Sequence, residues 1–317
     1  MSKRVAALLL LMAASGIGGA GCNHSIAVSS PPSSTQAGSP PVASAATGSP
    51  TPSAAPAALL LKVTSEGGFI NPVASLNALP IVEVYTDGRI LTPGPQDAIA
   101  PSPLLSPVEV RNVGVAGAAS IAKAVHDAGL DRPASAGPGI PGDAGTDVFS
   151  VTIAGETTET RLAGNGAGVG GPGAPGVGPR AGSGDPSAAV DPERAAAFLL
   201  LTRLLDSTDA WGGSGAEISR YAPSGFRIFA APLTAAPDAT TPPDTAVWPL
   251  STTLAQFGSA AQPDRGIAGL RQGAVVGADA ATLGPVFAKA TQDTAFTSGG
   301  TSWTLYVRPL LPDELPA

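Results

Sequence analysis

The N-terminal leader, residues 1–21, decides which part of this chain is left to fold. It begins with two basic residues, continues with an unbroken apolar run from Val5 to Met12, and ends in small residues that lead to Cys22. This order of positive charge, apolar segment and small-residue cleavage zone is typical of a secretory signal. We therefore expect residues 1–21 to be removed on export and to take no part in the fold.

The four residues Gly19-Ala20-Gly21-Cys22 resemble the lipobox of bacterial lipoproteins, in which small residues precede an invariant cysteine. The resemblance implies that a diacylglycerol is joined to the Cys22 sulfur and that Cys22 becomes the first residue of the mature chain. Lipoboxes usually carry an aliphatic residue where this chain has Gly19. Two alternatives stay open: ordinary cleavage after Ala20, which gives a secreted protein, and an uncleaved membrane helix, for which the apolar stretch barely reaches spanning length. Cys22 is the only cysteine, so no intrachain disulfide can form.

Residues 23–57 contain no Asp, Glu, Lys or Arg and consist mainly of Ser, Pro, Ala, Thr and Gly. Such a stretch has too little apolar surface to offset the entropy lost on ordering, so we expect a disordered tether. Its prolines favour an extended conformation that would span up to roughly 110 Å, against about 30–35 Å for a random coil. In either state the tether would hold the folded part away from the membrane.

The overall charge narrows the expected partners. The chain carries 17 basic and 24 acidic residues, a net charge of −7, which becomes −9 when Lys3 and Arg4 leave with the leader. An acidic exported domain should not bind nucleic acid or anionic lipid headgroups. We expect the membrane, reached through the lipid anchor, and a cell-wall or envelope protein as partners, and no nucleic acid.

Apolar runs separated by glycine turns predict several β-hairpins in the folded part. Asp87-Gly88 stands between two apolar runs, and Asp-Gly at such a place is a strong signal for a two-residue turn. Gly155-Glu156 and Gly299-Gly300 stand at comparable places later in the chain. We expect strands at residues 59–63, 81–86, 89–91, 108–113, 149–153, 157–162, 226–229, 273–276, 294–297 and 303–308.

Two stretches have the spacing of amphipathic helices. Apolar residues recur at i, i+4 and i+7 from Ile121 to Ala128, and Gly129 is the expected C-cap. A later helix is expected over residues 279–290, where Pro285 should break or restart it because proline cannot donate to the preceding turn.

A further helix should open at Asp191-Pro192-Glu193, which offers a capping carboxylate and a proline at the first helical position. A Gly/Pro-rich loop, residues 164–186, precedes it. Hairpins outnumber strand–helix–strand units, so residues 58–317 should form a single α+β domain, a mainly antiparallel sheet with two or three helices on one face. The two halves could be related modules, but no residue-level repeat joins them. The expected buried stripe of this helix is Phe198, Leu201 and Leu205.

Two short motifs fit catalytic or cofactor patterns by their letters alone. Ser120-Ile121-Ala122-Lys123 fits the SxxK pattern of serine β-lactamases, but the SDN and KTG elements of that mechanism are missing, so a solvated helix face with Lys123 and Asp127 paired is favoured. The glycines of residues 166–171 fit a dinucleotide fingerprint, yet Pro172 follows and no helix opens there. We expect a loop instead.

The remaining polar and aromatic candidates are sparse. His24 lies in the tether, and His126 is expected at a helix surface, so metal sites that need two histidines are disfavoured. Paired carboxylates could do acid–base work, but solvated helix ends and tail are favoured for them, and three tryptophans could line a sugar-binding face. No catalytic, cofactor or metal residue is therefore predicted, and Cys22 is the one predicted site residue. The carboxylates are Asp206 with Asp209 and Asp313 with Glu314; the tryptophans are Trp211, Trp248 and Trp303.

Six short stretches from about residue 60 onward carry a resemblance to other sequences: Gly67-Gly68-Phe69, Val84 to Arg89, Thr92 to Gln96, Trp248-Pro249-Leu250, Val275 to Ala280 and Ser298 to Glu314. In these stretches the chain resembles a family of uncharacterised exported proteins of actinobacteria, in which cysteine often stands where this chain has Gln272. The resemblance implies a shared domain fold and brings no assigned activity. We expect a lipid-anchored protein on the extracytoplasmic face of the cell membrane that binds or scaffolds, with an envelope hydrolase or an apolar-ligand carrier as alternatives.

Overall fold

The computed structural model describes the folded part of the chain. It describes residues 57–67, 75–96, 100–132, 134–135, 145–163, 192–206, 209–212, 217–233, 244–261 and 267–316. The chain divides into two compact units, Met1–Pro52 and Ser53–Ala317, and all the described residues belong to the second. The leader, Cys22, the tether up to residue 56 and the loop 164–186 lie outside the described residues.

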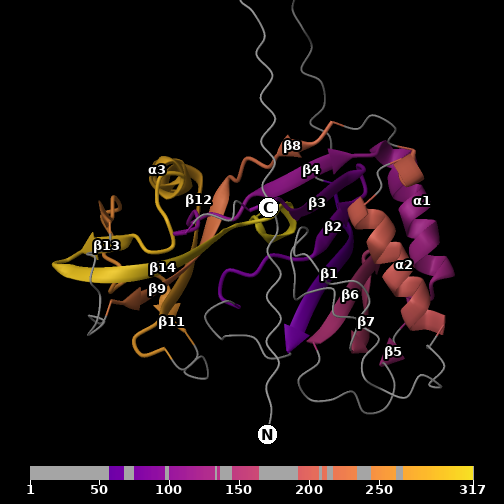
Figure 1. The fold of residues 1–317 in the computed structure, drawn as a ribbon, viewed down its shortest axis with the longest axis horizontal. Helices are drawn as coiled ribbons and strands as arrows, with labels where there is room; N and C mark the ends of the chain where they lie inside the picture. Colours follow the sequence, from indigo (N-terminus) through magenta and orange to yellow (C-terminus); the bar gives the residue numbers. More distant parts are fainter. Residues whose placement is uncertain are drawn as a thin grey trace, which may run out of the picture. The chain divides into compact units, whose positions relative to one another are not determined.

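The described strands form two mostly antiparallel sheets, accompanied by three α-helices (Figure 1), so the α+β class expected from the sequence is confirmed. The first sheet is built from β1 (Leu59–Gly67), β2 (Val82–Tyr85), β3 (Arg89–Pro93), β4 (Val108–Asn112), β5 (Ala134–Ser135), β6 (Gly145–Ile153), β7 (Glu156–Ala163) and β8 (Ser219–Arg220). The second is built from β9 (Gly225–Pro232), β10 (Thr245–Val247), β11 (Ser259–Ala260), β12 (Arg271–Val276), β13 (Ala295–Ser298) and β14 (Thr301–Pro309). Their orders are β5-β7-β6-β1-β2-β3-β4-β8 and β10-β13-β14-β9-β12-β11.

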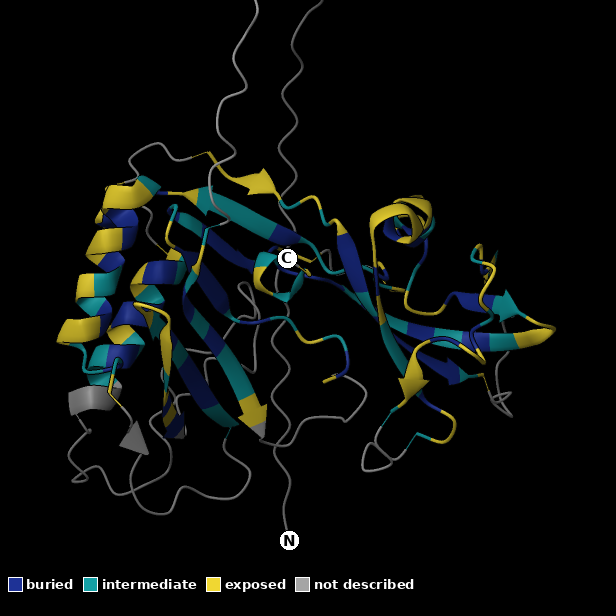
Figure 2. Cartoon of the chain, turned by 180° about the vertical axis from the view of Figure 1, so that it is seen from behind, coloured by how far each residue is buried: buried dark blue, intermediate teal, exposed yellow. Residues whose placement is uncertain are grey.

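Two helices cover one face of the first sheet. Helix α1 (Gly114–Asp127) and helix α2 (Pro192–Asp206) share a core with the strands, in which Ile121 and Val125 of α1 meet buried side chains such as Val63 and Phe149. Figure 2 shows both helices with buried inner faces and exposed outer faces. The predicted hairpins around Asp87-Gly88 and Gly155 are present, and Gly129 follows α1 with a positive φ of 74°, as expected of a C-cap glycine.

The buried stripe of α2 differs from the prediction. The fully buried residues are spaced i, i+3, i+4 and i+7 and begin one position before Phe198. Phe198 and Leu205 are only half-buried. Because leucines follow one another over three positions, the sequence leaves the rotation of this helix undetermined, and packing against the sheet and α1 sets it. The fully buried residues are Ala197, Leu200, Leu201 and Leu204.

The second sheet carries its own helix and core. Helix α3 (Gly277–Phe287) packs on one face, where Phe287 makes edge-to-face contacts with Phe226 and Phe296 at ring-centroid distances of 5.3 and 6.1 Å. The predicted break at Pro285 is wrong, because the proline lies inside α3. It sits in the last turn, so the one hydrogen bond that it cannot donate is lost close to the helix end, while burial of Phe287 continues to favour the helix.

The C-terminal segment joins the two sheets. After β14, Leu311 enters a cluster with Tyr85, Leu91 and Val108 of the first sheet, and the short 3-10 helix Pro312–Glu314 follows. A second link lies before β4, where the Leu104 N–H donates to the Ala290 carbonyl oxygen at 2.9 Å.

Candidate functional site

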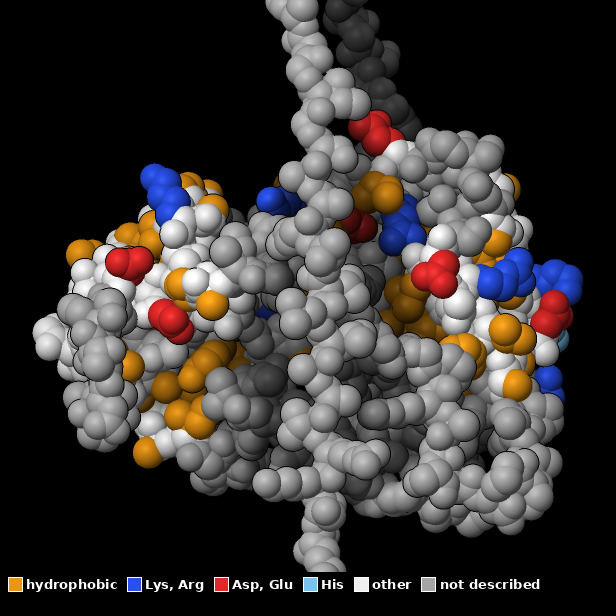
Figure 3. All heavy atoms as spheres, viewed as in Figure 1, with side chains coloured by type: hydrophobic (Ala, Val, Ile, Leu, Met, Phe, Trp, Pro, Cys, Tyr) orange, Lys and Arg blue, Asp and Glu red, His pale blue; other side chains and the backbone are white. Residues whose placement is uncertain are grey.

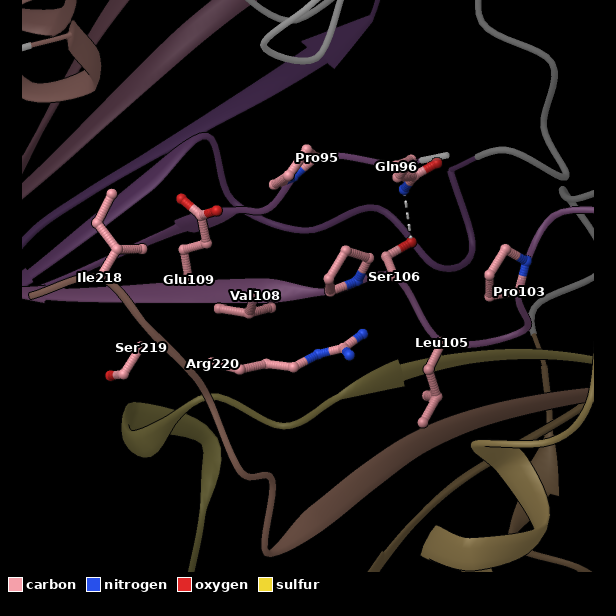
Figure 4. Close-up of a pocket in the computed structure, with 11 residues that line it drawn as sticks. Pro95, Gln96, Pro103, Leu105, Ser106, Val108, Glu109, Ile218, Ser219 and Arg220 are labelled. Atoms are coloured by element: carbon pink, nitrogen blue, oxygen red, sulfur yellow. Dashed lines mark hydrogen bonds between the residues drawn. The ribbon is translucent and has the colours of Figure 1, made fainter. Parts of the chain in front are cut away.

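A cleft in the first sheet is the best-formed candidate site among the described residues. It has a volume of about 340 Å³ and is formed by the connection from β3 to β4, the start of β4, and β8 (Figure 4). Eleven residues line it: Pro95, Gln96, Pro103, Leu105, Ser106, Pro107, Val108, Glu109, Ile218, Ser219 and Arg220.

The proline-rich connection between β3 and β4 builds one wall of the cleft. Its two ends are joined where the Gly94 N–H donates to the Pro107 carbonyl oxygen at 2.8 Å. Leu104 is buried in the core of the second sheet and fixes the middle of the connection. Proline restricts φ and lowers the entropy of the unfolded chain, so this wall is held in shape with few hydrogen bonds of its own.

A hydrogen bond crosses the connection inside the cleft. The Gln96 Nε2 donates to the Ser106 Oγ at 2.9 Å, as the dashed line in Figure 4 marks. The serine oxygen therefore has an amide donor as its neighbour and not a base. The described residues that line the cleft include no histidine, lysine, aspartate or cysteine, and their one carboxylate is that of Glu109. Neither cleft serine is bonded to it, because Ser106 accepts from Gln96 and Ser219 donates to the Val110 carbonyl oxygen, so no pair of nucleophile and base forms there.

Two charged side chains enter the cleft from neighbouring strands. Glu109 of β4 and Arg220 of β8 are directly opposite each other in the antiparallel register. Figure 4 shows the Arg220 side chain extending along the cleft toward the end where Leu105 and Ser106 lie, with the Glu109 carboxylate on the Pro95 side. Glu109 makes a loose ion pair with Arg111, whose Nη2 is 3.8 Å from the Glu109 Oε2. The cleft can thus offer an apolar wall, hydroxyl groups and one guanidinium to a ligand.

A second polar cluster lies between the first sheet and the C-terminal segment. Lys62 Nζ lies 2.8 Å from Glu83 Oε1 and 2.8 Å from Asp313 Oδ2, and the Tyr85 hydroxyl donates to Glu83 Oε2 at 2.6 Å. Glu83 and Tyr85 are both 0% exposed. Burial raises the pKa of Glu83 although Lys62 opposes this, and burial next to Glu83 also raises the pKa of Tyr85. Burial alone would lower the pKa of Lys62, but the two carboxylates raise it. This cluster therefore holds the C-terminal segment against the first sheet, with Glu83 and Tyr85 buried and Lys62 and Asp313 partly exposed.

The SxxK residues have structural partners along α1. The Ser120 hydroxyl donates to the Ala116 carbonyl oxygen at 3.0 Å, and Lys123 pairs with Asp127 at 2.6 Å. Both Ser120 and Lys123 are exposed, so the interpretation as a solvated helix face is confirmed. His126 is exposed as expected, and its Nδ1 lies 2.6 Å from the Asp131 Oδ2. A hydrogen bond with His126 lowers the pKa of Asp131.

The carboxylates of the C-terminal segment contradict the expected solvation of the tail. Asp313 pairs with Lys62 across 251 positions of sequence, and Glu314 forms two hydrogen bonds of 2.6 Å with Arg308. Burial alone would raise the pKa of Glu314, but the hydrogen bonds from Arg308 lower it. The prediction was wrong because Lys62 is distant in sequence from Asp313, and because Arg308 meets Glu314 only when the chain turns from β14 into the 3-10 helix. Asp206 is exposed at the end of α2.

The three tryptophans do not form a sugar-binding face. Trp211 lies in the core of the first sheet, and Trp248 and Trp303 lie in that of the second. All three are buried. The glycine motif at residues 166–171 lies outside the described residues.

Sequence reasoning did not find the charged residues of the cleft. Glu109 and Arg220 are far apart along the chain and meet only because β8, a strand of two residues, pairs with β4. The one local signal was the run of prolines after β3, and the stretch Thr92 to Gln96, part of the family resemblance, supplies two lining residues.

The described surface has no single-sign charged patch on the face shown in Figure 3 and no group of metal-ligating side chains. On the face in Figure 3, acidic and basic side chains are scattered among apolar and uncharged ones. In the part of the chain that the structure describes, no three His, Cys, Asp or Glu side chains are grouped to hold a metal ion. None of the described helices combines the length and apolar character required to cross a bilayer.

No family model matches the chain, and no curated protein or solved structure is significantly similar to it.

Proposed function

We propose that this protein is a lipid-anchored binding module of the cell envelope, held on the extracytoplasmic face of the membrane through Cys22. Its ligand site in this proposal is the cleft beside β4 and β8. The observation that carries the binding role is the character of this cleft: it presents Gln96, Ser106 and Arg220 to a ligand, and its described lining lacks a paired nucleophile and base.

The anchoring part of the proposal is supported by the leader and the composition that follows it. Each methylene buried in the bilayer contributes roughly 0.8 kcal/mol, so one acyl chain binds reversibly and two or more hold the protein in place. A diacylglycerol on Cys22 supplies two such chains. The uncharged tether after it would then let the folded part search the space above the membrane.

The two alternative functions have weaker support. A hydrolase would need an activated nucleophile or a pair of carboxylates in an open site, and the described cleft contributes only Glu109 as an acid. An apolar-ligand carrier would need an apolar cavity, whereas Glu109 and Arg220 line this one. Binding of a partly polar ligand is the function that the residues support best.

The anchor is tested by replacing Cys22. We expect Cys22→Ala to release the mature protein into the medium or to stall its processing, measured by membrane fractionation and intact mass. Unchanged membrane retention together with unchanged mass in this variant would refute the lipid anchor.

The binding role is tested by filling the cleft. Ser106→Phe places a ring beside Gln96, and Ser120→Phe places the same ring on the exposed face of α1 as a matched control. We expect the tethered wild-type protein and Ser120→Phe to retain an envelope protein or glycan from solubilised envelopes, and Ser106→Phe to lose it while unfolding at an unchanged temperature. Recovery of the same component by all three proteins would contradict the cleft as the ligand site.

A further inference from the structure

We propose that the cleft binds a ligand with a single carboxylate on a small apolar body, and that Arg220 binds that carboxylate. This inference rests on the binding function proposed above and names the chemical class of the ligand. It starts from the unequal pairing of the arginines in the folded part.

Most described arginines have a partner within the protein. Among the arginines whose side chains the structure describes, Arg220 of β8 and Arg227 of β9 have no ion-pair, hydrogen-bond or ring partner, and only Arg220 lines the cleft. A guanidinium presents its N–H groups in a planar fork that matches a carboxylate, and a charge-assisted pair of this kind is stronger than a neutral hydrogen bond. The partnered arginines are Arg89 with Asp87, Arg111 with Glu109, Arg132 with Asp131, Arg161 with Glu66, Arg308 with Glu314, Arg203 with Trp211, and Arg271 with the carbonyl oxygens of Phe257 and Gly258.

The position of Arg220 keeps it free of internal pairing. Glu109 is its cross-strand neighbour, but that carboxylate is on the Pro95 side of the cleft and pairs with Arg111. The Arg220 side chain instead extends toward the end of the cleft where Leu105 and Ser106 lie, and the Ser106 hydroxyl there accepts from Gln96. A ligand carboxylate placed there would meet the guanidinium and leave the Gln96–Ser106 hydrogen bond intact.

Glu109 limits the ligand to one negative charge. It lines the same cleft as Arg220, and its carboxylate would repel a second anionic group placed nearby. One guanidinium balances one carboxylate, whereas phosphate or a dicarboxylate would bring additional charge toward Glu109. A monocarboxylate fits this pair of residues best.

The rest of the lining favours an apolar and compact ligand body. Leu105, Val108 and Ile218 lie along the cleft with three prolines, and Ile218 is 55% exposed, so it has apolar surface left for a ligand. A volume of about 340 Å³ lies at the small end of the range for ligand pockets. Short aliphatic acids and the C-terminal end of a peptide share this chemistry.

Calorimetric titration of the full chain with matched acids and amides tests the proposal. One arm uses 4-methylpentanoate and 4-methylpentanamide; the other uses N-acetyl-Ala-Pro-Leu with a free C-terminal carboxylate and the same peptide as its C-terminal amide. We expect at least one acid to bind roughly tenfold to a hundredfold more tightly than its amide, since a hydrogen-bonded charge pair is worth about that factor. The arm that shows the preference identifies the source of the carboxylate.

Two arginine variants show which residue is responsible for the preference for the acid over its amide. Arg220→Gln should remove the preference for the acid, whereas Arg132→Gln, on an exposed arginine outside the cleft, should keep it. Both residues are exposed, so an unchanged unfolding temperature is expected for each. The carboxylate assignment is overturned if acid and amide bind the wild-type chain equally, if Arg220→Gln keeps the preference, or if no acid binds.

These outcomes separate this inference from the binding function itself. Equal binding of acid and amide that Ser106→Phe abolishes would overturn the carboxylate assignment and leave the cleft as a binding site. Absence of binding by every probe, together with an envelope component recovered equally by Ser106→Phe, would overturn both.

Discussion

The two sheets use the same local plan with different surroundings. In each, a strand passes into a helix through a valine and a glycine of positive φ: Val113-Gly114 leads from β4 to α1, and Val276-Gly277 leads from β12 to α3, with glycine φ values of 68° and 61°. In each, a hairpin with positive-φ residues at its turn follows the helix, β6–β7 in the first sheet and β13–β14 in the second. We call these two strand-to-helix connections joints. Because their backbone geometry is alike, a difference in their stability must come from the residues packed around them.

The joint of the first sheet is enclosed, whereas that of the second is open. A Cβ on Gly88 would lie 2.3 Å from the Gly114 carbonyl oxygen, and the Val113 N–H donates to the Gly88 carbonyl oxygen at 2.9 Å. The Asn112 Oδ1 also accepts from the Gly114 N–H at 2.8 Å. A Cβ on Gly114 or on Gly277, the glycines of the two joints, would meet nothing within 4 Å. The first joint is therefore enclosed only from the side of Gly88, where a side chain would meet the Gly114 backbone.

Substitution of the glycine that encloses the first joint should give the largest loss of stability. Gly88→Ala forces a side chain into a φ of 92° and against the backbone of Gly114, so we expect a loss of about 3–5 kcal/mol in the free energy of unfolding. Gly277→Ala adds only the conformational strain, about 1–2 kcal/mol. Urea denaturation of both variants measures the difference, and equal losses would show that the enclosure of the first joint has no energetic weight.

This contrast also shows how far the sequence can be interpreted. Asp87-Gly88 and Gly299-Gly300 predicted their hairpins because a two-residue turn depends on the residues within it. Nothing in those residues says that Gly88 will contact Gly114, because that contact depends on how β3, β4 and α1 come together. The fold class could be predicted for the same reason, because alternation and turns are local features of the sequence. The division of the strands between two sheets could not be predicted, because it depends on contacts between distant segments.

The candidate site illustrates the same limit. Pro95 and Gln96 stand in a proline-rich run that attracts attention in the sequence, but Arg220 lies in a strand of two residues that no alternation could predict. Lys62 and Asp313 are similarly joined across nearly the whole folded chain. Pairings of this kind depend on tertiary packing, so the charged half of the cleft and the C-terminal ion pairs required the structure.

The two sheets differ as well in how they hold the C-terminal segment. Its adjacent carboxylates point to different partners: Asp313 pairs with Lys62 in the first sheet, and Glu314 pairs with Arg308 in the second. The first pair adjoins the fully buried Glu83, whereas the second joins two partly exposed side chains and adjoins no further described charged group that is fully buried. The costs of breaking them should therefore differ in size and in pH dependence.

Removal of the Lys62 charge should give the next largest effect. Lys62→Met leaves Glu83 buried without its cation, and we expect a loss of about 2–4 kcal/mol at pH 7. The pKa of Glu83 is raised, so its contribution to stability is present below its unfolded value of 4.5 and is lost as the pH rises through the folded value. The cost of Lys62→Met should therefore shrink as the pH falls toward 4.5, which urea denaturation at several pH values would show.

The paired substitution separates charge from packing in this cluster. Lys62→Met with Glu83→Gln removes both charges, so we expect most of the lost stability to return and the pH dependence to flatten. Two outcomes would mean that the lysine acts by filling space and not by neutralising Glu83. In one, Lys62→Met lowers the free energy of unfolding equally at pH 4.5 and pH 7. In the other, adding Glu83→Gln restores none of the lost stability.

Breaking the pair of the second sheet should have the smallest effect of the three and the opposite pH dependence. Glu314→Gln weakens two hydrogen bonds to Arg308, both partly exposed, so we expect a loss of about 1–2 kcal/mol at pH 7. The pKa of Glu314 is lowered, so its contribution is present above the unfolded value of 4.5 and is lost as the pH falls through the folded value. The cost of Glu314→Gln should thus disappear in acid, as urea denaturation from pH 7 to pH 3 would show, while Asp127→Asn on the exposed face of α1 should cost less than about 0.5 kcal/mol throughout. If Glu314→Gln instead became more costly in acid, the ionised Glu314 would not be the source of the lost stability, and its pairing with Arg308 could not be what attaches the segment to the second sheet.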